Sequence, residues 1–556
     1  MTWRAEARRA LEEEVFDLLV VGGGITGSGI ARDASGRGLK VALVDAGDIG
    51  GATSSRSSRL VHGGLRYLET FEFGLVFEAL RERRRLLELA PHLVHPLPFL
   101  FPVFRGDDPG LPKLAAGMLL YEGLSLFRSP GRQRFLTRGA ALEIEPKLRA
   151  MGLVGGALYH DAQVDDARLT LSVARGAHES GAVLISHAGV KCFDRGPDQV
   201  TTVTIEDRLN TGTFRTRARL VLNAAGPWSD RVRQLADPSA TPRLRTTKGV
   251  HLLFDRERIG NRNAIIFRSV IDDRVMFVLP WGRFTYVGTT DTEFDGDPAD
   301  VVADASDIRY LLDSANHIYP DARLTAEDIV SSWAGVRPLL APAEESGASV
   351  DETSREHAIW RDPSGLLNVA GGKLTTFREM AAEAASVAAG ILKGEYGISS
   401  GDFHTEFAPI PGAPELGVPR LLADLDEAAK DLGLPEDTLK HLIGRYGKNA
   451  SALIALIRSE PSLGDPILPE LDYLMAESVY AVQSEWALTL EDVMRRRLQL
   501  FYEARDGGLS VAARVAAQIG PLPELRWDAV EIKAQIDRYS DTVTRTRPAE
   551  NDSSEG

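Results

Sequence analysis

Short apolar runs and one helical segment follow one another near the start of the chain. Residues 16–21, FDLLVV, are apolar except for Asp17, as in a parallel strand that is buried on both faces. Residues 25–36 follow a glycine turn and are predicted to form a helix, and residues 40–44 form a second apolar run. This order predicts the first strand–helix–strand unit of a doubly wound α/β domain.

The turn between the first strand and the helix has the glycine spacing G-x-G-x-x-G. The first glycine permits a tight turn, the second lets the backbone approach a pyrophosphate, and the third lets helix and strand pack closely. The second strand ends in an acid placed to accept hydrogen bonds from a ribose. Many glycine-rich turns bind nothing, but the flanking strands, helix and acid together favour a dinucleotide site. The residues assigned to this site are Gly22, Gly24, Ile25, Thr26, Gly27 and Asp45.

A loop dense in small hydroxyl residues follows, with the sequence GATSSRSSRLVHGGLRYLE at residues 51–69. Its hydroxyl groups can donate hydrogen bonds to the phosphate and sugar oxygens of a ligand. The alternative is an ordinary polar surface loop, and the glycine pair Gly63–Gly64 behind the hydroxyl residues argues against it. We therefore expect this loop to lie against the same ligand.

The pattern changes three times along the rest of the chain. Strand-like runs between residues 182 and 222, the last leading into NAAGPW, predict a second part of the dinucleotide domain. Alternating positions from about residue 242 to 340 predict an antiparallel sheet. A strand, the pair Gly371–Gly372 and a long helix come next, and the chain after residue 400 is helical. The predicted boundaries are 16–90, 151–245 and 341–395 for a discontinuous dinucleotide-binding domain, 91–150 and 246–340 for a substrate-binding domain, 401–540 for a helical domain, and 541–556 for a disordered tail.

Three apolar segments between residues 71 and 127 are harder to place. Residues 71–89 predict a helix whose arginines mostly face solvent. Residues 91–104 are rich in proline, which favours an edge strand or an extended loop. Residues 111–127 form an apolar helix that either belongs to the core or enters one leaflet of a membrane.

Seven motifs together resemble those of one family of flavoproteins. They are GGGITGSGIARDASGRG, SSRLVHGGLRYLE, VLNAAGPWSD, TKGVHLLF, LPWGRFTYVGTTD, WAGVRPLLAP and GGKLTTFREMA. With these motifs the chain resembles the FAD-dependent glycerol-3-phosphate dehydrogenases, respiratory flavoproteins within the larger family that includes D-amino-acid and glycine oxidases. The resemblance covers about residues 16–539, and Phe377 stands where that family usually has tyrosine.

The resemblance implies a fold, a cofactor and a reaction. The expected fold class is α/β plus α+β, with a doubly wound FAD-binding domain of Rossmann type, an antiparallel substrate domain and a helical carboxyl-terminal cap. The cofactor is FAD. The implied reaction is oxidation of sn-glycerol 3-phosphate to dihydroxyacetone phosphate by hydride transfer to FAD, with the electrons passing to a membrane quinone.

The resemblance also extends the predicted cofactor site beyond the glycine turn. It places three segments against FAD: the hydroxyl loop, the turn NAAGPW, and the start of the long helix after Gly371–Gly372. That helix points its positive end at the flavin, where it would stabilise negative charge after reduction. The residues added to the cofactor site are Thr53, Ser54, Ser58, His62, Gly63, Gly64, Leu65, Ala225, Gly226, Gly372, Lys373, Leu374 and Thr375.

Cations and one histidine are the candidates for substrate chemistry. Arginine suits a phosphate through its planar fork, and lysine adds a point charge. An imidazole with a pKa near neutrality suits removal of the hydroxyl proton, although a lone strand histidine is more often a core residue. The substrate-binding candidates are Arg66, Tyr67, Arg337, Arg355 and Lys373, and the catalytic candidates are His251, Arg337 and Lys373.

Composition and charge exclude several classes. The chain has 556 residues, 44% hydrophobic and 26% charged, which is ordinary for globular proteins. A net charge of −15 argues against nucleic acid as a partner. The single cysteine, Cys192, rules out an internal disulfide framework and fits a reducing cytosol. No metal-binding spacing and no apolar run of membrane-spanning length appears, so we expect no metal and a cytoplasmic location, with peripheral attachment to the inner face of the cytoplasmic membrane left open.

The sequence leaves alternatives for the reaction and for the helical segment. The same substrate could be oxidised by dioxygen, or the fold could serve an amine or amino-acid oxidase, which would anchor a carboxylate. A non-catalytic flavin-binding protein is a third alternative, although storage of a cofactor needs no cluster of cations. The helical segment, with Arg495–Arg497 solvated or paired with neighbouring acids, could serve packing, a homodimer contact or membrane attachment.

Overall fold

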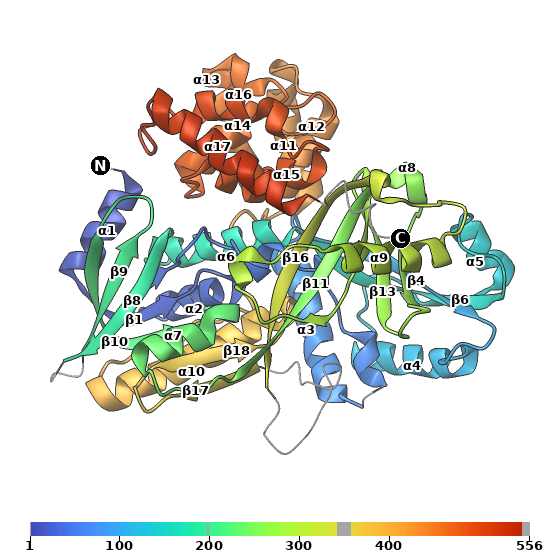
Figure 1. Cartoon of the computed structure of the whole chain (residues 1–556), viewed down its shortest axis with the longest axis horizontal. Coiled ribbons are helices and arrows are strands. Elements are labelled where there is room, and N and C mark those ends of the chain that lie inside the picture. Colours follow the sequence, from blue (N-terminus) through green and yellow to red (C-terminus); the bar gives the residue numbers. More distant parts are fainter. Residues whose placement is uncertain (1, 70, 197–199, 342–356, 548–556) are drawn as a thin grey trace.

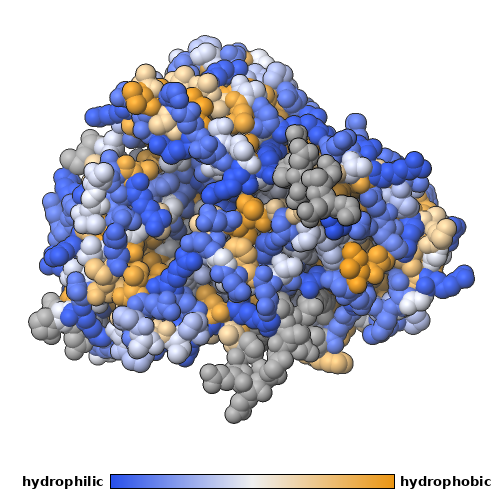
Figure 2. Space-filling view, viewed as in Figure 1, coloured by the Kyte–Doolittle hydropathy of each residue, from blue (hydrophilic) through white to orange (hydrophobic). Residues whose placement is uncertain are grey.

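Two β-sheets and a helical carboxyl-terminal segment make up the fold (Figure 1). The structure is a computed structural model that describes residues 2–69, 71–196, 200–341 and 357–547, without the side chain of Arg66. In Figure 1 the carboxyl-terminal helices lie above both sheets, and the amino-terminal helix α1 (Trp3–Glu13) lies at the outer edge of the first sheet. Most of the surface in Figure 2 is hydrophilic, with apolar side chains in small separate patches.

The first sheet has eight strands, and its centre is parallel. The order β18-β10-β1-β2-β7 is parallel throughout, β17 adds an antiparallel edge, and the β8–β9 pair continues antiparallel from β10. Its strands are β1 (Val15–Val21), β2 (Val41–Val44), β7 (Val183–Ile185), β8 (Ala188–Arg195), β9 (Thr201–Asp207), β10 (Thr213–Asn223), β17 (His357–Arg361) and β18 (Leu367–Gly371). This arrangement confirms the predicted doubly wound fold.

Strand β1 is buried on both faces, as its apolar run predicted. Leu18 and Val20 pack with the helices on one face, whereas Leu19 and Val21 pack with α1 and the β8–β9 pair on the other. The helices of the first face are α2 (Ile25–Gly36), α6 (Asp166–Glu179) and α10 (Phe377–Tyr396), and α7 (Ser229–Ala236) lies on the second. Because β2 and β10 flank β1, the chain reverses its winding direction here, which is where doubly wound sheets bind ligands.

The second sheet has ten strands in the order β15-β11-β14-β13-β12-β4-β6-β3, with β16 paired to β11 and β5 to β6. Its strands are β3 (Leu60–Val61), β4 (Val94–Phe104), β5 (Arg134–Thr137), β6 (Leu153–Val164), β11 (Leu244–Asp255), β12 (Ala264–Arg268), β13 (Val275–Trp281), β14 (Phe284–Gly288), β15 (Thr292–Glu293) and β16 (Ile329–Leu340). The helices beside it are α3 (Phe73–Leu89), α4 (Leu111–Leu124), α5 (Arg138–Ile144), α8 (Arg256–Ile259) and α9 (Ala305–Ile318). Pairing is antiparallel except between β12 and β4, so the predicted antiparallel domain is confirmed.

The proline-rich strand β4 lies inside this sheet, so the prediction of an edge strand or loop was wrong. It pairs along its whole length with β6, but β12 pairs with it only at Phe99 and Leu100. Few N–H groups of β4 are needed for hydrogen bonds to β12. Prolines, which have no N–H group, are therefore tolerated on that edge.

Strand β6 also departs from the predicted domain boundary. Residues 151–164 were assigned to the dinucleotide domain, whereas β6 forms the antiparallel partner of β4, β5 and β3 in the second sheet. Its long register with β4 fixes it there, and no local signal in the sequence states which distant strand a run will pair with.

One face of helix α4 confirms the core alternative for residues 111–127. Leu114, Met118 and Tyr121 are buried against the second sheet, which makes one face a core face. Leu119 is 65% exposed and Phe127, just beyond the helix, is 80% exposed. The helix is therefore amphipathic in packing although its sequence is apolar on both faces.

The carboxyl-terminal segment consists of packed helices that share a core with the second sheet. The helices are α11 (Val418–Asp431), α12 (Glu436–Tyr446), α13 (Ala450–Ser459), α14 (Met475–Ser484), α15 (Leu500–Glu503), α16 (Leu509–Ile519) and α17 (Ala529–Thr546). A π-helical turn at Asp492–Arg497 precedes α15. One apolar cluster joins these helices to Trp333 and Tyr286 of the sheet, which confirms a helical cap.

Part of the predicted disordered tail is helical. Helix α17 continues through residues 541–546, and Val543 is buried against Gly507. Arg547 then donates hydrogen bonds to the carbonyl oxygens of Phe501 and Ala504. The polar composition of this stretch predicted disorder, because only a few side chains anchor it. Residues 548–556 lie outside the described part of the chain.

The packing of Gly27 generates the first prediction. A Cβ at Gly27 would overlap the carbonyl oxygen of Gly22, whereas Gly139 on α5 has open space around it. We expect Gly27→Ala to lower the free energy of unfolding by about 1–3 kcal/mol because backbone atoms cannot move aside as side chains can. The matched control Gly139→Ala should change it by less than about 1 kcal/mol. Equal stabilities of the two variants in denaturant titrations would contradict this packing.

Candidate functional site

A cavity of about 1030 Å³ lies at the carboxyl ends of the parallel strands of the first sheet. Its volume is at the upper end for ligand pockets, which suits a ligand as long as a dinucleotide. Twelve of the residues assigned from the sequence line it, namely Gly22, Gly24, Ile25, Thr26, Asp45, Thr53, Ser54, Ala225, Gly226, Gly372, Lys373 and Leu374. Segments far apart in the sequence therefore meet around one space.

The glycine turn fits a pyrophosphate by its backbone alone. Gly22 has φ +110°, and a Cβ on it would lie 2.5 Å from the carbonyl oxygen of Ala224. The helix that follows starts from Gly24, which has no side chain to cap it, so the positive helix end faces the cavity. Such a helix start binds anions. The residues present therefore fit the diphosphate of FAD.

Asp45, the acid that the sequence assigns to a ribose, lines the cavity directly after β2. Its Oδ2 accepts a hydrogen bond from Gly23 N at 2.5 Å, and its Oδ1 accepts one from Gly47 N at 2.7 Å. Burial raises the pKa of this carboxyl group, and the two N–H donors oppose the rise. Each carboxylate oxygen keeps a further lone pair for a ribose hydroxyl.

Thr53 and Ser54 hold the hydroxyl loop in place as well as lining the cavity. Thr53 Oγ1 donates to the carbonyl oxygen of Val336 at 2.7 Å, and Ser54 Oγ accepts from Ile25 N at 2.9 Å. The Thr53 hydrogen is thus used within the protein, whereas the Ser54 hydroxyl can still donate to a ligand. The loop joins the glycine turn to β16 of the second sheet.

The glycine pair and its neighbours lie beside this cavity and do not line it. His62 N donates to Thr375 Oγ1 at 3.1 Å, and Gly63 N donates to Tyr121 Oη at 3.0 Å. The Lys373 ammonium lies over the Tyr67 ring, 3.6 Å from its centroid. The segment with Gly64 and Leu65 is thereby fixed between α4 and the start of α10. The side chain of Arg66 and the whole of Arg355 lie outside the described residues.

Arg337 lies on the face of the second sheet that β11 and β16 share. It pairs in register with Thr247, and its guanidinium lies over Gly249, where any Cβ would collide with it. Asp291 Oδ1 accepts from Arg337 Nη1 at 3.0 Å, and Thr289 Oγ1 lies 3.0 Å from Nη2. The guanidinium is thus held in one orientation.

His251 lies on the same face, two residues along β11 from Gly249. Its Nε2 lies 2.9 Å from Ser58 Oγ, and its ring stacks on Trp333 with centroids 5.0 Å apart. Burial, together with the positive charges of Arg337 and Arg59, lowers the pKa of His251 well below 6.5. The sequence-based expectation of a near-neutral pKa therefore does not hold for this buried ring. Its Nδ1 has no hydrogen-bond partner among the residues that the structure describes.

Several buried charges beside the site escaped the sequence analysis. Arg83 was expected to face solvent with the other arginines of its helix, but it is buried in an ion pair with Asp161. Arg59 lies between the rings of Trp281 and Trp333, 4.4 and 4.8 Å from their centroids. The partners of both arginines are distant in the sequence, so helical periodicity alone could not identify these contacts.

The cavity wall also contains residues that the sequence analysis missed. Most of the missed residues follow β7 or belong to the carboxyl-terminal segment, namely His187, Ala188, Val190, Asp492 and Arg496. Asp48 and Arg56 follow β2 instead. Strand β7 lies beside β2, with Ile185 in register with Val44. The rule that carboxyl ends of parallel strands meet at one edge would have found the residues after β7.

Comparison with protein families gives two matches that divide the chain. Residues 17–390 match the family described as FAD dependent oxidoreductase, and residues 403–532 match the C-terminal domain of alpha-glycerophosphate oxidase. The second match begins close to where the carboxyl-terminal helices start.

Individual relatives match over almost the whole chain. Glycerol-3-phosphate dehydrogenase 2 of Mycobacterium tuberculosis (strain ATCC 25618 / H37Rv) is 41% identical over 96% of this chain and 89% of its own length. Aerobic glycerol-3-phosphate dehydrogenase of Staphylococcus saprophyticus is 37% identical over 92% of each protein. The solved structure of the glycerol-3-phosphate dehydrogenase from Bacillus halodurans complexed with FAD is similar with a TM-score of 0.82, 31% identity, and coverage of 99% of this chain and 98% of that one.

The environment of His251 predicts its titration. Since its folded-state pKa lies below the unfolded value of 6.5, the contribution of this ring to stability is present above pH 6.5 and is lost as the pH falls toward the folded pKa. In the substrate-free protein, its histidine NMR signal should not titrate between about pH 8 and pH 6. The signal is assigned by its loss in His251→Gln. A midpoint near the ordinary histidine value would contradict this environment.

Proposed function

The chain belongs to the family of FAD-dependent glycerol-3-phosphate dehydrogenases, and from that premise we propose how its residues oxidise sn-glycerol 3-phosphate. The product is dihydroxyacetone phosphate, and the electrons pass to a membrane quinone. The observation that carries the proposal is that held cations and a neutral, buried histidine lie beside a cavity that fits FAD. The flavin ring supplies the acceptor for the hydride, so the chain must supply anchors and a proton acceptor.

Arg337 and Lys373 are proposed to hold the phosphate. Asp291 and Thr289 orient the Arg337 fork, which suits bidentate binding of phosphate oxygens. Lys373 stands before the first turn of α10, over the Tyr67 ring, and lines the cofactor cavity at the same time. A phosphate anchored between these cations would place the neighbouring carbinol carbon toward the cavity. The resemblance adds Arg66 to this set, and the local sequence adds Arg355 as a further candidate anchor.

His251 is proposed to accept the hydroxyl proton through Nδ1. The ring is neutral at physiological pH, because burial, Arg337 and Arg59 disfavour the imidazolium. Ser58 fixes the ring through Nε2, and in the tautomer that donates to Ser58 the Nδ1 atom is an acceptor. A phosphate bound at Arg337 offsets the nearby positive charge, so substrate binding should raise the basicity of this histidine.

Contact with a membrane surface is proposed for the end of the molecule formed by α3 and α4. Exposed apolar side chains on these packed helices and their flanking turns are Phe71, Phe73, Phe77, Leu119, Leu120, Leu126 and Phe127. The exposed Arg128 and Arg132 follow them and suit anionic headgroups. Among the described residues, no helix combines the length and apolar character needed to cross a bilayer. These side chains would enter one leaflet and bring the cofactor site near its quinone.

The proposed reaction is tested by mixing the purified holoenzyme anaerobically with sn-glycerol 3-phosphate. We expect the visible flavin band to bleach, and a soluble quinone analogue to restore it faster than dioxygen does. Absence of bleaching would overturn the substrate assignment. Faster recovery with dioxygen would instead favour an oxidase.

Arg337→Ala should weaken substrate binding without releasing FAD. Loss of a buried charged partner costs about 2–5 kcal/mol, so the substrate concentration for half-maximal flavin reduction should rise by about 30-fold or more. Arg245→Ala is the matched control, since Arg245 lies on the neighbouring strand β11 and pairs with the exposed Glu293. Equal substrate dependence in both variants, measured by stopped-flow absorbance, would remove Arg337 from the site.

The membrane contact is tested by Leu119→Ser combined with Phe127→Ser. Each exposed apolar side chain gains about 1.5–3 kcal/mol on burial, so the double variant should bind anionic vesicles at least about tenfold less. Phe407→Ser is the control, because Phe407 is 76% exposed but lies in the segment before the carboxyl-terminal helices. Equal loss in both, measured by co-sedimentation, would contradict the proposed surface.

A further inference from the structure

The carboxyl-terminal helices form one wall of the cofactor cavity. Thr489, Asp492 and Arg496 line it from the π-helical turn and its approach, and Gln535 and Tyr539 line it from α17. They face the loop after β2 and the start of β8, which bound the same cavity from the first sheet. The helical segment is thus not separate from the nucleotide site.

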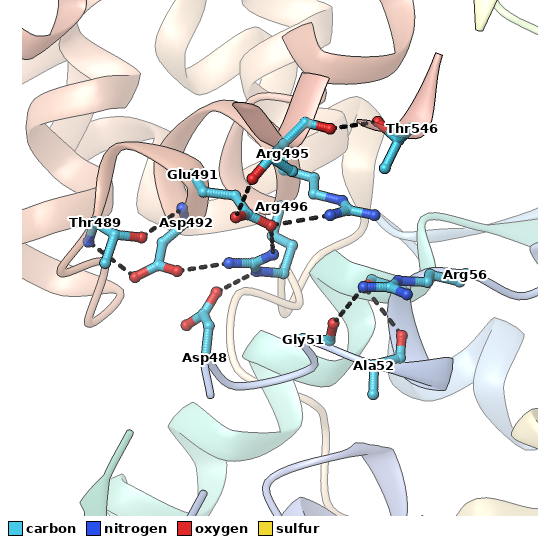
Figure 3. A network of polar contacts seen from close by, with 12 residues as sticks. Asp48, Gly51, Ala52, Arg56, Thr489, Glu491, Asp492, Arg495, Arg496 and Thr546 are labelled. Atoms are coloured by element: carbon cyan, nitrogen blue, oxygen red, sulfur yellow. Dashed lines mark hydrogen bonds and ion pairs between the residues drawn. The ribbon is translucent and has the colours of Figure 1, made fainter. Parts of the chain in front are cut away.

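Asp48 links the loop after β2 to the carboxyl-terminal segment. It is buried, and it forms ion pairs with both Arg496 and Arg497 (Figure 3 shows the pair with Arg496). Arg497 Nη2 donates to Asp48 Oδ1 at 2.9 Å, and Arg497 also donates to the carbonyl oxygen of Glu485 at 2.6 Å. In a regular helix, consecutive side chains point about 100° apart. The wider π-helical turn lets two neighbouring arginines reach one carboxylate.

The loop that carries Asp48 is the one that shapes the ribose position. Gly50 N donates to the carbonyl oxygen of Gly23 at 3.0 Å, and Gly51 N donates to that of Asp48 at 2.9 Å. Gly23 in turn donates to Asp45, the acid placed for the ribose. Fixing Asp48 therefore fixes the backbone between the glycine turn and Asp45.

His187 forms the second link between the helical segment and the nucleotide site. Its Nε2 lies 2.9 Å from Asp492 Oδ2, while its backbone N–H donates to the carbonyl oxygen of Gly47 at 2.7 Å. Ala188 N donates to the carbonyl oxygen of Asp45 at 2.7 Å. Burial would lower the pKa of His187, but Asp492 and Asp48 outweigh it and raise the pKa.

Asp492 also has several partners within the helical segment. The N–H groups of Leu488 and Thr489 both donate to its Oδ2 at 3.0 Å, and Arg496 Nη2 lies 2.5 Å from its Oδ1. Figure 3 shows Asp492 between Thr489 and Arg496.

Asp48, His187 and Asp492 have the spacing of metal ligands, but the arginines already neutralise both carboxylates. The cluster is therefore an ion-pair network, with no charge left for a cation.

We infer that the carboxyl-terminal helices are a structural part of the adenosine half of the FAD site, and that Asp48, Arg496, Arg497, His187 and Asp492 are positioning residues that retain the cofactor. Through this network the helices hold the two backbone segments, 45–51 and 187–190, that enclose the nucleotide. The inference rests on the FAD assignment and does not depend on the substrate. It gives the helical segment a role that the sequence left open between packing, dimer contact and membrane attachment.

The chain offers a matched control in another buried ion pair with the carboxyl-terminal segment. Arg168 on α6 forms a bidentate ion pair with Glu485, with N–O distances of 2.6 and 2.7 Å, and both side chains are buried. This pair also joins the first half of the chain to the carboxyl-terminal helices, but neither residue lines the cofactor cavity. Asp48→Asn and Glu485→Gln therefore each remove one carboxylate charge from a buried arginine contact, and only Asp48 belongs to the cavity.

The test measures release of FAD from each purified holoenzyme after dilution, followed by the fluorescence of free flavin. Asp48→Asn should raise the FAD dissociation constant by at least about tenfold, because it leaves the buried charges of Arg496 and Arg497 less compensated and loosens the backbone that encloses the nucleotide. Glu485→Gln should stay within about twofold of the unmodified chain, even if its thermal midpoint falls. ADP, which carries only the adenosine and diphosphate, should lose affinity for the Asp48→Asn apoprotein by a similar factor.

His187→Gln provides a second variant in case Asp48→Asn does not fold. It keeps a polar side chain of similar size but removes the imidazole Nε2 that contacts Asp492, and it should raise the FAD dissociation constant by at least about threefold. Unchanged FAD release in the folded variants, equal weakening by Glu485→Gln, or unchanged ADP affinity would each overturn the inference. If glycerol 3-phosphate failed to bleach the flavin, these measurements would still stand, so the two proposals fail separately.

Discussion

The close approach of backbone at Gly22, Gly27 and Ala224 is the constraint on which the rest of the structure depends. No side chain fits between the glycine turn, the first helix and the end of β10, so three elements meet through main-chain atoms. This contact aligns the carboxyl ends of β1, β2 and β10 at one edge of the sheet. The helix end, Asp45 and the start of β8 consequently face one cavity. The second sheet and the helical segment are then placed around that edge, through Thr53–Val336 and Asp48–Arg497.

Features that depend on local pattern could be predicted from the sequence. The glycine spacing, the doubly buried β1 and the acid at Asp45 were each visible in a few consecutive residues, and the structure has them where they were expected. The antiparallel sheet was visible as an alternation of apolar and polar positions along the sequence. These features follow from backbone geometry, which has the same period wherever it occurs.

Features that depend on distant partners could not be predicted in this way. Asp48 and Arg497 are separated by 449 positions, and nothing near either residue identifies the other. The interior place of β4, the transfer of β6 to the second sheet and the buried Arg83 were missed for the same reason. The pKa of His251 likewise reflects Arg337 and Arg59, whose nearness to the ring is created by strand register and packing.

The cofactor cavity and the residues proposed to bind substrate are distinct but share one boundary. Lys373 lines the large cavity, and its ammonium group also contacts Tyr67, whereas Arg337 and His251 lie outside that cavity on the second sheet. This division fits a reaction in which one sheet carries the electron acceptor and the other holds the substrate. The helical segment borders both parts, since it packs on Trp333 of the second sheet and lines the cofactor cavity at Asp492 and Arg496.

The most direct test of this account is hydrogen–deuterium exchange of the apoprotein with and without FAD. If separated segments enclose one cofactor, FAD should slow exchange together in residues 22–26, 45–52, 187–190, 371–374 and 489–496, which bound the cavity. Exchange at the exposed ends of α3 and α4 should not change. Protection that is missing from the first and last of these segments, or that appears only elsewhere, would contradict the account.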